Sequence, residues 1–162
     1  MKTLLRTLLY LALIVWLGAE VFFPVIAAVT FTTLPDTHIA GSIVGQLLRA
    51  LHWMGLIAGL VALLLLAIAP TWGIYKPRSV IVPMVLVILM IGATAYSQFA
   101  IIPSMERDRI AAGGAIDTAD NSSPQTIHFN KLHRRSTLVE EMVLLLGLAT
   151  VVFVARAETV RA

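Results

Sequence analysis

Four side chains that could exchange protons or hold a metal ion interrupt the long apolar runs of this 162-residue chain: Glu20, His52, Gln98 and Glu140. An ionisable group inside a membrane-spanning helix is costly, so it normally faces a partner, a water-filled cavity or a solute path. A carboxylate can carry a proton, and together with an imidazole it suits Zn²⁺, Ni²⁺, Cu²⁺ or Mn²⁺. The first question is therefore whether the helices that carry these residues bring them together.

The composition predicts a membrane protein. Of the residues, 59% are hydrophobic and only 13% are charged, and the mean hydropathy is +0.90, as expected for a chain that lies in a bilayer. The absence of cysteine excludes disulfides, iron–sulfur clusters and thiolate metal sites. The net charge of +3 comes from basic residues scattered at the ends of apolar runs, not from a basic stripe, so nucleic acid is not an expected partner.

The apolar runs predict four membrane-spanning helices, since crossing the hydrocarbon takes about 20 helical residues. The expected spans are about 7–30, 50–69, 79–102 and 137–156. Helices satisfy their own backbone N–H and C=O groups in lipid. We therefore expect an all-α fold, an integral membrane four-helix antiparallel bundle that forms a single domain over 1–162.

Two connections are expected at opposite ends of the second span. Residues 70–78 contain two prolines and a glycine and predict a tight turn, with Trp72 and Tyr75 at the headgroup level. On the other side, the turn at 34–36 precedes an amphipathic helix over about 37–49, which carries a helical stripe of apolar residues.

The third and fourth helices are expected to extend beyond the bilayer on one side, as a protruding helical hairpin over about 99–136. Pro103 could kink the third helix, and Gly113-Gly114 should end it. The flexible link over 113–122 then leads to Ser123-Pro124, which is typical of an N-cap followed by proline in the first helical turn. The fourth helix is thus predicted to begin well before the bilayer.

The four polar residues are predicted to lie at one depth. An α-helix rises about 1.5 Å per residue. Measured along its own helix, each polar residue lies about 21 to 30 Å from the basic residue or proline at the far end of that apolar run. They therefore form a layer near the opposite membrane face. We expect a metal or polar site at Glu20, His52, Gln98 and Glu140, with His128 and His133 at its rim.

The fourth helix is predicted to turn one stripe inward. At the helical period this stripe contains His133, Thr137, Glu140, Leu144, Gly147 and Val151. Gly147 indicates a close helix contact, and Gly55 and Gly59 form a similar pair of small residues in the second span. Glu20 has a second interpretation, as a structural carboxylate that is hydrogen-bonded to His52 or to a tryptophan N–H.

Three stretches resemble the small four-helix membrane family named after transmembrane protein 205, also catalogued as domain of unknown function 4149. They are WLGAEVFFPVIAAVTFTTLP (16–35), LLRALHWMG, and FNKLHRRSTLVEEMVLLLGL (129–148). The resemblance includes an FxxLHxxS-like motif at Phe129, Leu132, His133 and Ser136, and it implies a four-span bundle in a membrane. It implies no reaction. Glu20 departs from the pattern, where a small or uncharged residue is expected.

Three classes of function remain. The first is a small permease or resistance factor that handles a metal ion, a proton or a small solute at the polar layer. The second is a cofactor-binding subunit with His52 and His133 as axial haem ligands, although His133 should lie about 8 Å further out than His52. The third is a structural or assembly subunit whose protruding helices dock a partner. No catalytic residue is expected, because GxSxG, HExxH, P-loop and dinucleotide-binding motifs are all missing from the sequence.

The location follows from the spans. We expect an integral membrane protein, in a bacterial-type inner membrane, that contacts the lipid bilayer and possesses either a protein partner or a second copy of itself. Lysine and arginine are divided six against six between the two sides, so the positive-inside rule does not decide the orientation. The basic residues near the termini lie in very short segments, which favours cytoplasmic termini.

Overall fold

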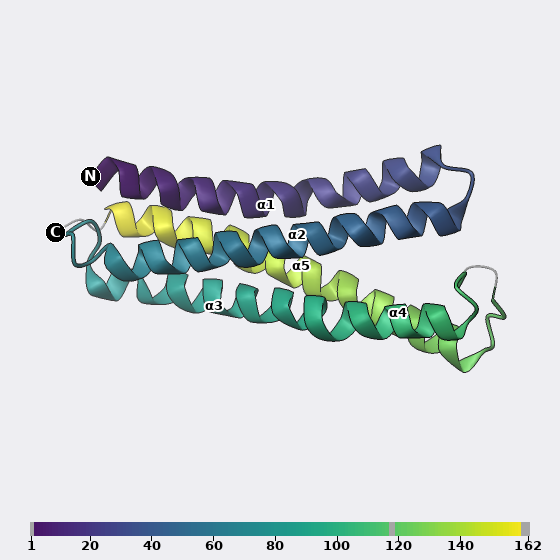
Figure 1. Cartoon of the computed structure of the whole chain (residues 1–162). Coiled ribbons are helices and arrows are strands. Elements are labelled where there is room, and N and C mark those ends of the chain that lie inside the picture. Colours follow the sequence, from purple (N-terminus) through teal and green to yellow (C-terminus); the bar gives the residue numbers. More distant parts are fainter. Residues whose placement is uncertain (1, 117–118, 160–162) are drawn as a thin grey trace.

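The computed structural model describes residues 2–116 and 119–159, and these residues form helices joined by short loops (Figure 1). The elements are α1 (Lys2–Thr33), α2 (Thr37–Ile68), the 3₁₀ helix η1 (Pro77–Ser79), α3 (Ile81–Tyr96), the π-helical segment η2 (Ser97–Ile101), α4 (Ile102–Ala111) and α5 (Pro124–Thr159). Within the described residues, four helical segments are long and apolar enough to cross a membrane: α1, α2, the run from η1 through α4, and α5. The prediction of an all-α four-helix bundle is confirmed.

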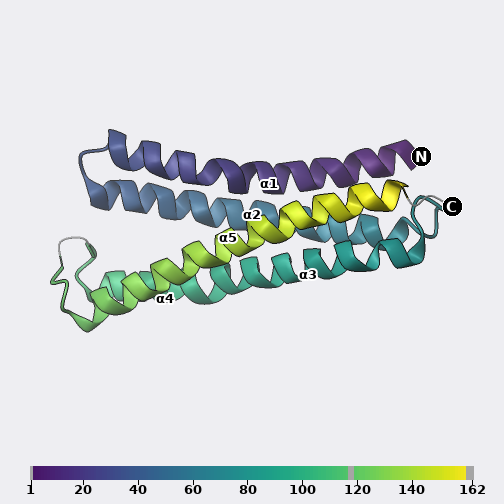
Figure 2. The same ribbon diagram turned by 180° about the vertical axis from the view of Figure 1, so that it is seen from behind.

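Neighbouring helices in the bundle run antiparallel. α1 packs on α2, α2 on α3, and both α3 and α4 on α5, while α5 also contacts α1 and closes the bundle. α5 crosses the others diagonally: its first turns lie along α4, and its last turns approach the beginning of α1 (Figure 2). The helices that α5 contacts therefore change along its length.

The amphipathic helix predicted over about 37–49 and the second span form one continuous helix, α2, of 32 residues. The segment contains glycine but no proline, and glycine alone weakens a helix without breaking it. Asp36 caps this helix, because its carboxylate accepts hydrogen bonds from the backbone N–H groups of His38 and Ile39 at 2.9 and 3.1 Å. The turn predicted at 34–36 is thus confirmed.

The loop between α2 and α3 is a tight turn, as predicted, with Gly73 at a φ of 61°. Trp72 is exposed, whereas Tyr75 is buried against the bundle, and their placement at the headgroup level stays a prediction. Its hydroxyl donates to a Glu158 carboxylate oxygen at 3.3 Å, and the Arg6 guanidinium lies 5.9 Å from the ring centroid. Burial, followed by the nearby Glu158 charge, raises the pKa of Tyr75. These contacts seal this end of the bundle.

The hairpin between α4 and α5 has the predicted ends. α4 ends at Ala111, and Gly113 and Gly114 follow with φ angles of 86° and 95°, in the left-handed region that favours glycine. The Ser123 hydroxyl accepts from the backbone N–H of Thr126 at 3.2 Å and caps α5. Residues 117–118 of the predicted link lie outside the described residues, and the extension of the hairpin beyond the bilayer stays a prediction.

A π-helical turn, η2, interrupts the third helical segment at the depth of the polar layer. The backbone N–H of Ile102 donates to the carbonyl of Ser97, five residues back. Pro103 follows, and its missing N–H and its ring both disfavour α-helical bonding to the carbonyl four residues earlier. The predicted disturbance at Pro103 thus takes the form of a π-turn on its N-terminal side, a feature often found at functional sites.

Candidate functional site: a buried polar layer

His52 is the centre of a hydrogen-bonded layer inside the bundle. Its side chain on α2 is fully buried, with 0% exposure. Its Nδ1 lies 3.0 Å from Gln98 Oε1, in η2, and its Nε2 lies 2.7 Å from Glu140 Oε1, on α5. The structure therefore brings together three of the four residues predicted for the site, each from a different helical segment.

The imidazole of His52 can satisfy these two partners in two protonation states. With an amide oxygen at Nδ1 and a carboxylate at Nε2, both contacts are hydrogen bonds when both ring nitrogens carry protons. If the amide of Gln98 turns over, its NH₂ group can donate to a neutral Nδ1 instead. The contact between His52 and Gln98 can thus be a hydrogen bond whether or not Nδ1 carries a proton.

Glu140 has one saturated oxygen and one unpaired oxygen. Oε1 accepts from His52 and also from the Ser97 hydroxyl at 3.2 Å, and the Ser136 hydroxyl lies 3.5 Å from that of Ser97. Oε2 is buried and has no hydrogen-bond partner among the described residues. A buried carboxylate oxygen without a partner is costly. It is the place in the layer where a proton or a cation would be stabilised.

Glu20, on α1, completes the layer from the other side. Its side chain is 5% exposed, and its Oε1 accepts from the indole N–H of Trp16 at 3.2 Å. Its charge interacts with those of Glu140 and His52. The second interpretation offered for Glu20, a carboxylate held by a tryptophan N–H, is therefore correct. Glu20 nevertheless lies beside the other ionisable groups.

Two glycines of α2 hold Trp16 in place. A Cβ at Gly55 would lie 2.5 Å from Nε1 of the indole, and one at Gly59 would lie 2.5 Å from its Cζ3. The expected close contact at this pair of small residues is thus filled by an aromatic ring. Because the ring is 1% exposed and donates to Glu20, the glycines position the carboxylate through Trp16.

The layer carries an excess of negative charge. The layer contains two carboxyl groups, Glu20 and Glu140, and one imidazole, so with both carboxyl groups ionised one negative charge remains even when His52 is protonated. Within residues 2–116 and 119–159, no lysine or arginine pairs with either acid. A charge that is buried away from water is costly unless an opposite charge compensates it. A second proton or a bound cation would supply it.

The stripe predicted to face inward on α5 is displaced by one residue along most of its length. His133 and Thr137 are exposed, whereas the buried positions are Leu132, Ser136, Val139, Val143, Gly147, Thr150 and Val154. The two stripes coincide at Gly147, where a Cβ would collide with Leu17. Adjacent residues of an α-helix point about 100° apart, so a shift of one residue turns His133 and Thr137 outward, while Glu140 still reaches His52.

The two histidines predicted at the rim do not contact the layer. His128 is exposed, and its Nδ1 lies 2.7 Å from Asp108 Oδ2 in the α4–α5 hairpin. The exposed ring of His133 stacks on Phe129, with ring centroids 6.4 Å apart. Two axial haem ligands must share one cavity. His52 is enclosed and has both ring nitrogens engaged, while His133 faces outward, so the geometry gives the haem hypothesis no support.

The described part of the chain holds no group of three or more histidine, aspartate or glutamate side chains that could ligate a metal ion. His52 has no free nitrogen, because Gln98 and Glu140 occupy both. Metal binding at this layer therefore needs His52 to give up one of these partners, whereas proton binding needs no more than a turn of the Gln98 amide.

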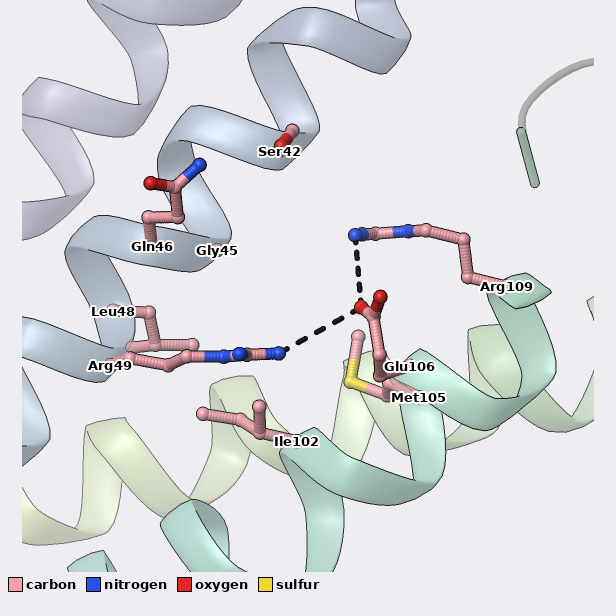
Figure 3. Close-up of a pocket in the computed structure, with 9 residues that line it drawn as sticks. All are labelled: Ser42, Gly45, Gln46, Leu48, Arg49, Ile102, Met105, Glu106 and Arg109. Carbon is pink, nitrogen blue, oxygen red and sulfur yellow. Dashed lines mark hydrogen bonds and ion pairs between the residues drawn. The ribbon is translucent and has the colours of Figure 1, made fainter. Parts of the chain in front are cut away.

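A surface cleft lies between α2 and α4. Its wider part has a volume of about 450 Å³ and is flanked by Arg49, Glu106 and Arg109 (Figure 3). An adjoining hollow of about 340 Å³ shares Arg49 and Glu106 and is also lined by Gln98. Gln98, which contacts His52, therefore lies between this hollow and the buried layer.

Two members of the layer, Ser97 and Ser136, were not expected from the sequence, and Trp16 was expected only as an unspecified tryptophan beside Glu20. Ser136 lies one helical turn before Glu140, and Ser97 is adjacent to Gln98, so both spacings were visible. The π-turn that directs Ser97 and Gln98 inward together was not, because adjacent residues on an α-helix point about 100° apart. The spacing of four residues between Trp16 and Glu20 was the sequence feature that could have predicted their hydrogen bond.

Four apolar antiparallel helices that enclose an acid–histidine layer define a small integral membrane helical bundle. The chain belongs to the family described as Domain of unknown function (DUF4149), whose family model matches residues 11–109. The match includes α2, α3 and most of α1 and α4, and it ends before α5, where the resemblance at 129–148 was found. No curated protein and no solved structure matches the chain.

Proposed function

We propose that this protein is a small membrane permease in which Glu20, His52 and Glu140 bind and release a proton during the passage of a small solute. One observation carries the proposal: the buried, unpaired Oε2 of Glu140, in a layer whose two carboxylates exceed its one imidazole. Proton binding neutralises the buried oxygen and removes the excess charge. The hollow lined by Gln98 and Arg49 lies on the outer side of the layer.

Neutralising Glu140 should abolish this proton exchange. Glu140→Gln keeps the shape of the side chain but removes the carboxylate, so we expect proton uptake into liposomes under an imposed pH gradient to fall about tenfold or more. A pH-sensitive dye inside the liposomes measures the rate. Glu141→Gln is the matched control, because Glu141 is the adjacent acid on α5 and is exposed. Equal rates for the two variants would contradict the proposal.

The transmembrane protein 205-like type is supported by the motif at 129–148. We propose a bacterial-type inner membrane with both termini in the cytoplasm, based on the short basic segments near the ends. We also propose that the protein is not an enzyme, since the layer lies inside the bundle and resembles no catalytic motif. A divalent metal remains an alternative cargo, which elemental analysis of purified protein tests.

A second function, a structural or assembly subunit, is favoured by apolar side chains at the α4–α5 hairpin. Ile110 and Ile127 are 67% and 58% exposed there, at the end of helices longer than a bilayer requires. They could contact a partner or a second copy of the chain. In this case the Glu140→Gln liposomes would behave like the Glu141→Gln liposomes, and chemical crosslinking at the hairpin would yield a defined complex.

A further inference from the structure

The arginines of the α2–α4 cleft are not used in the proton exchange described above. Arg49, on α2, points across the cleft toward α4, where Glu106 and Arg109 lie (Figure 3). Arg109 donates a hydrogen bond to Glu106 Oε2 at 3.2 Å. Arg49 approaches the same oxygen only to 3.8 Å, which is an ion pair but not a hydrogen bond.

Arg49 therefore has unused donors. In the described part of the chain it makes no hydrogen bond, although a guanidinium has five N–H groups in a fork that suits carboxylate and phosphate oxygens. The cleft walls contain two guanidiniums and one carboxylate, a net charge of about +1. Ser42 and Gln46 line the same cleft and add neutral polar groups.

The size of the cleft suits a small solute. Its volume of about 450 Å³ lies within the range of about 300–1,000 Å³ found for small-molecule sites. The hollow that shares Arg49 and Glu106 continues to Gln98, and Gln98 contacts His52. An anion bound at Arg49 would thus lie in a cleft that adjoins Gln98, the hydrogen-bond partner of His52, and its negative charge would favour uptake of a proton in the layer.

We propose that the α2–α4 cleft binds the carboxylate or phosphate group of a small anion through Arg49, with Arg109 as the second guanidinium. Glu106 orients Arg109 and is displaced from Arg49 when the anion binds. This inference names the solute class of the proposed permease and rests on that function for its connection to transport. The anion preference itself can be measured without transport.

The chain has no cysteine, so Ser42→Cys places one unique thiol in the cleft. In phosphatidylcholine nanodiscs, we expect an anionic methanethiosulfonate reagent to label this thiol about tenfold faster than a cationic one. Adding Arg49→Gln and Arg109→Gln should remove that preference. Arg107→Gln with Lys131→Gln, which also removes two positive charges but from exposed residues of α4 and α5 outside the cleft lining, should leave it intact.

Inorganic phosphate or succinate should slow the labelling in the nanodiscs, and Arg49→Gln should abolish this protection. If labelling is slowed by phosphatidylglycerol in the nanodisc and not by phosphate or succinate, the bound anion is a lipid headgroup at the same arginines. Faster labelling by the cationic reagent, or a preference that survives loss of both arginines, would overturn the proposal. Because no proton gradient is used, these results do not depend on the outcome of the Glu140→Gln flux experiment.

Discussion

Replacing Gly55 with alanine is expected to destabilise the bundle by about 1–3 kcal/mol, the usual cost of overpacking a well-packed core. The new methyl group would lie 2.5 Å from Nε1 and 2.9 Å from Cε2 of Trp16. An indole is rigid and cannot bend away as the end of a leucine can. The ring must therefore move, and with it the hydrogen bond from its N–H to Glu20.

Gly45→Ala is the matched control, since Gly45 lies on the same helix and a Cβ there meets no atom within 4 Å. Alanine is the better helix former, so this variant should be neutral or more stable by up to about 1 kcal/mol. The stability of both variants is measured as their resistance to unfolding in sodium dodecyl sulfate. If Gly55→Ala is as stable as Gly45→Ala, Trp16 does not pack against α2 as described.

Removing His52 should disturb the polar layer more than Gly55→Ala does. His52→Leu leaves Gln98 and Glu140 without their buried partner, and breaking a buried ion pair from one side typically costs about 3–5 kcal/mol. The same loss of an imidazole at His133→Leu should cost little, because His133 is exposed. The unfolding free energies of the two variants in detergent provide the comparison.

A double variant separates the charge effect from a general loss of packing. In His52→Leu with Glu140→Gln, the carboxylate that lost its partner is neutral, so the destabilisation should be clearly less than the sum of the two single values. Strictly additive values would show that His52 and Glu140 act independently, contrary to the 2.7 Å contact between them.

The helices were readable from the sequence because their signals are local. Long apolar runs predict spans, and the capping residue Asp36 and the paired glycines after α4 mark ends that the structure confirms. The depth of the polar residues was also readable, since helical rise is constant. His52, Gln98 and Glu140 could therefore be grouped before their contacts were known.

The direction in which side chains point was harder to predict, because it depends on how the helices cross. On α5 two stripes one residue apart were both compatible with the helical period, and packing against the other helices turns Ser136 inward and His133 outward. The π-turn at η2 shifts the register of the third segment and places Ser97 and Gln98 together. Neither effect is encoded in a single helix taken alone.

The central claim is that the layer of Glu20, His52 and Glu140 exchanges a proton, and an infrared pH titration of the protein in lipid tests it directly. A protonated carboxylic acid has a C=O stretch that a carboxylate lacks. We expect this band to appear as the pH is lowered, to be lost or shifted in both Glu140→Gln and Glu20→Gln, and to persist unchanged in Glu141→Gln. A band that is the same in all four proteins, or that never appears, would contradict the account.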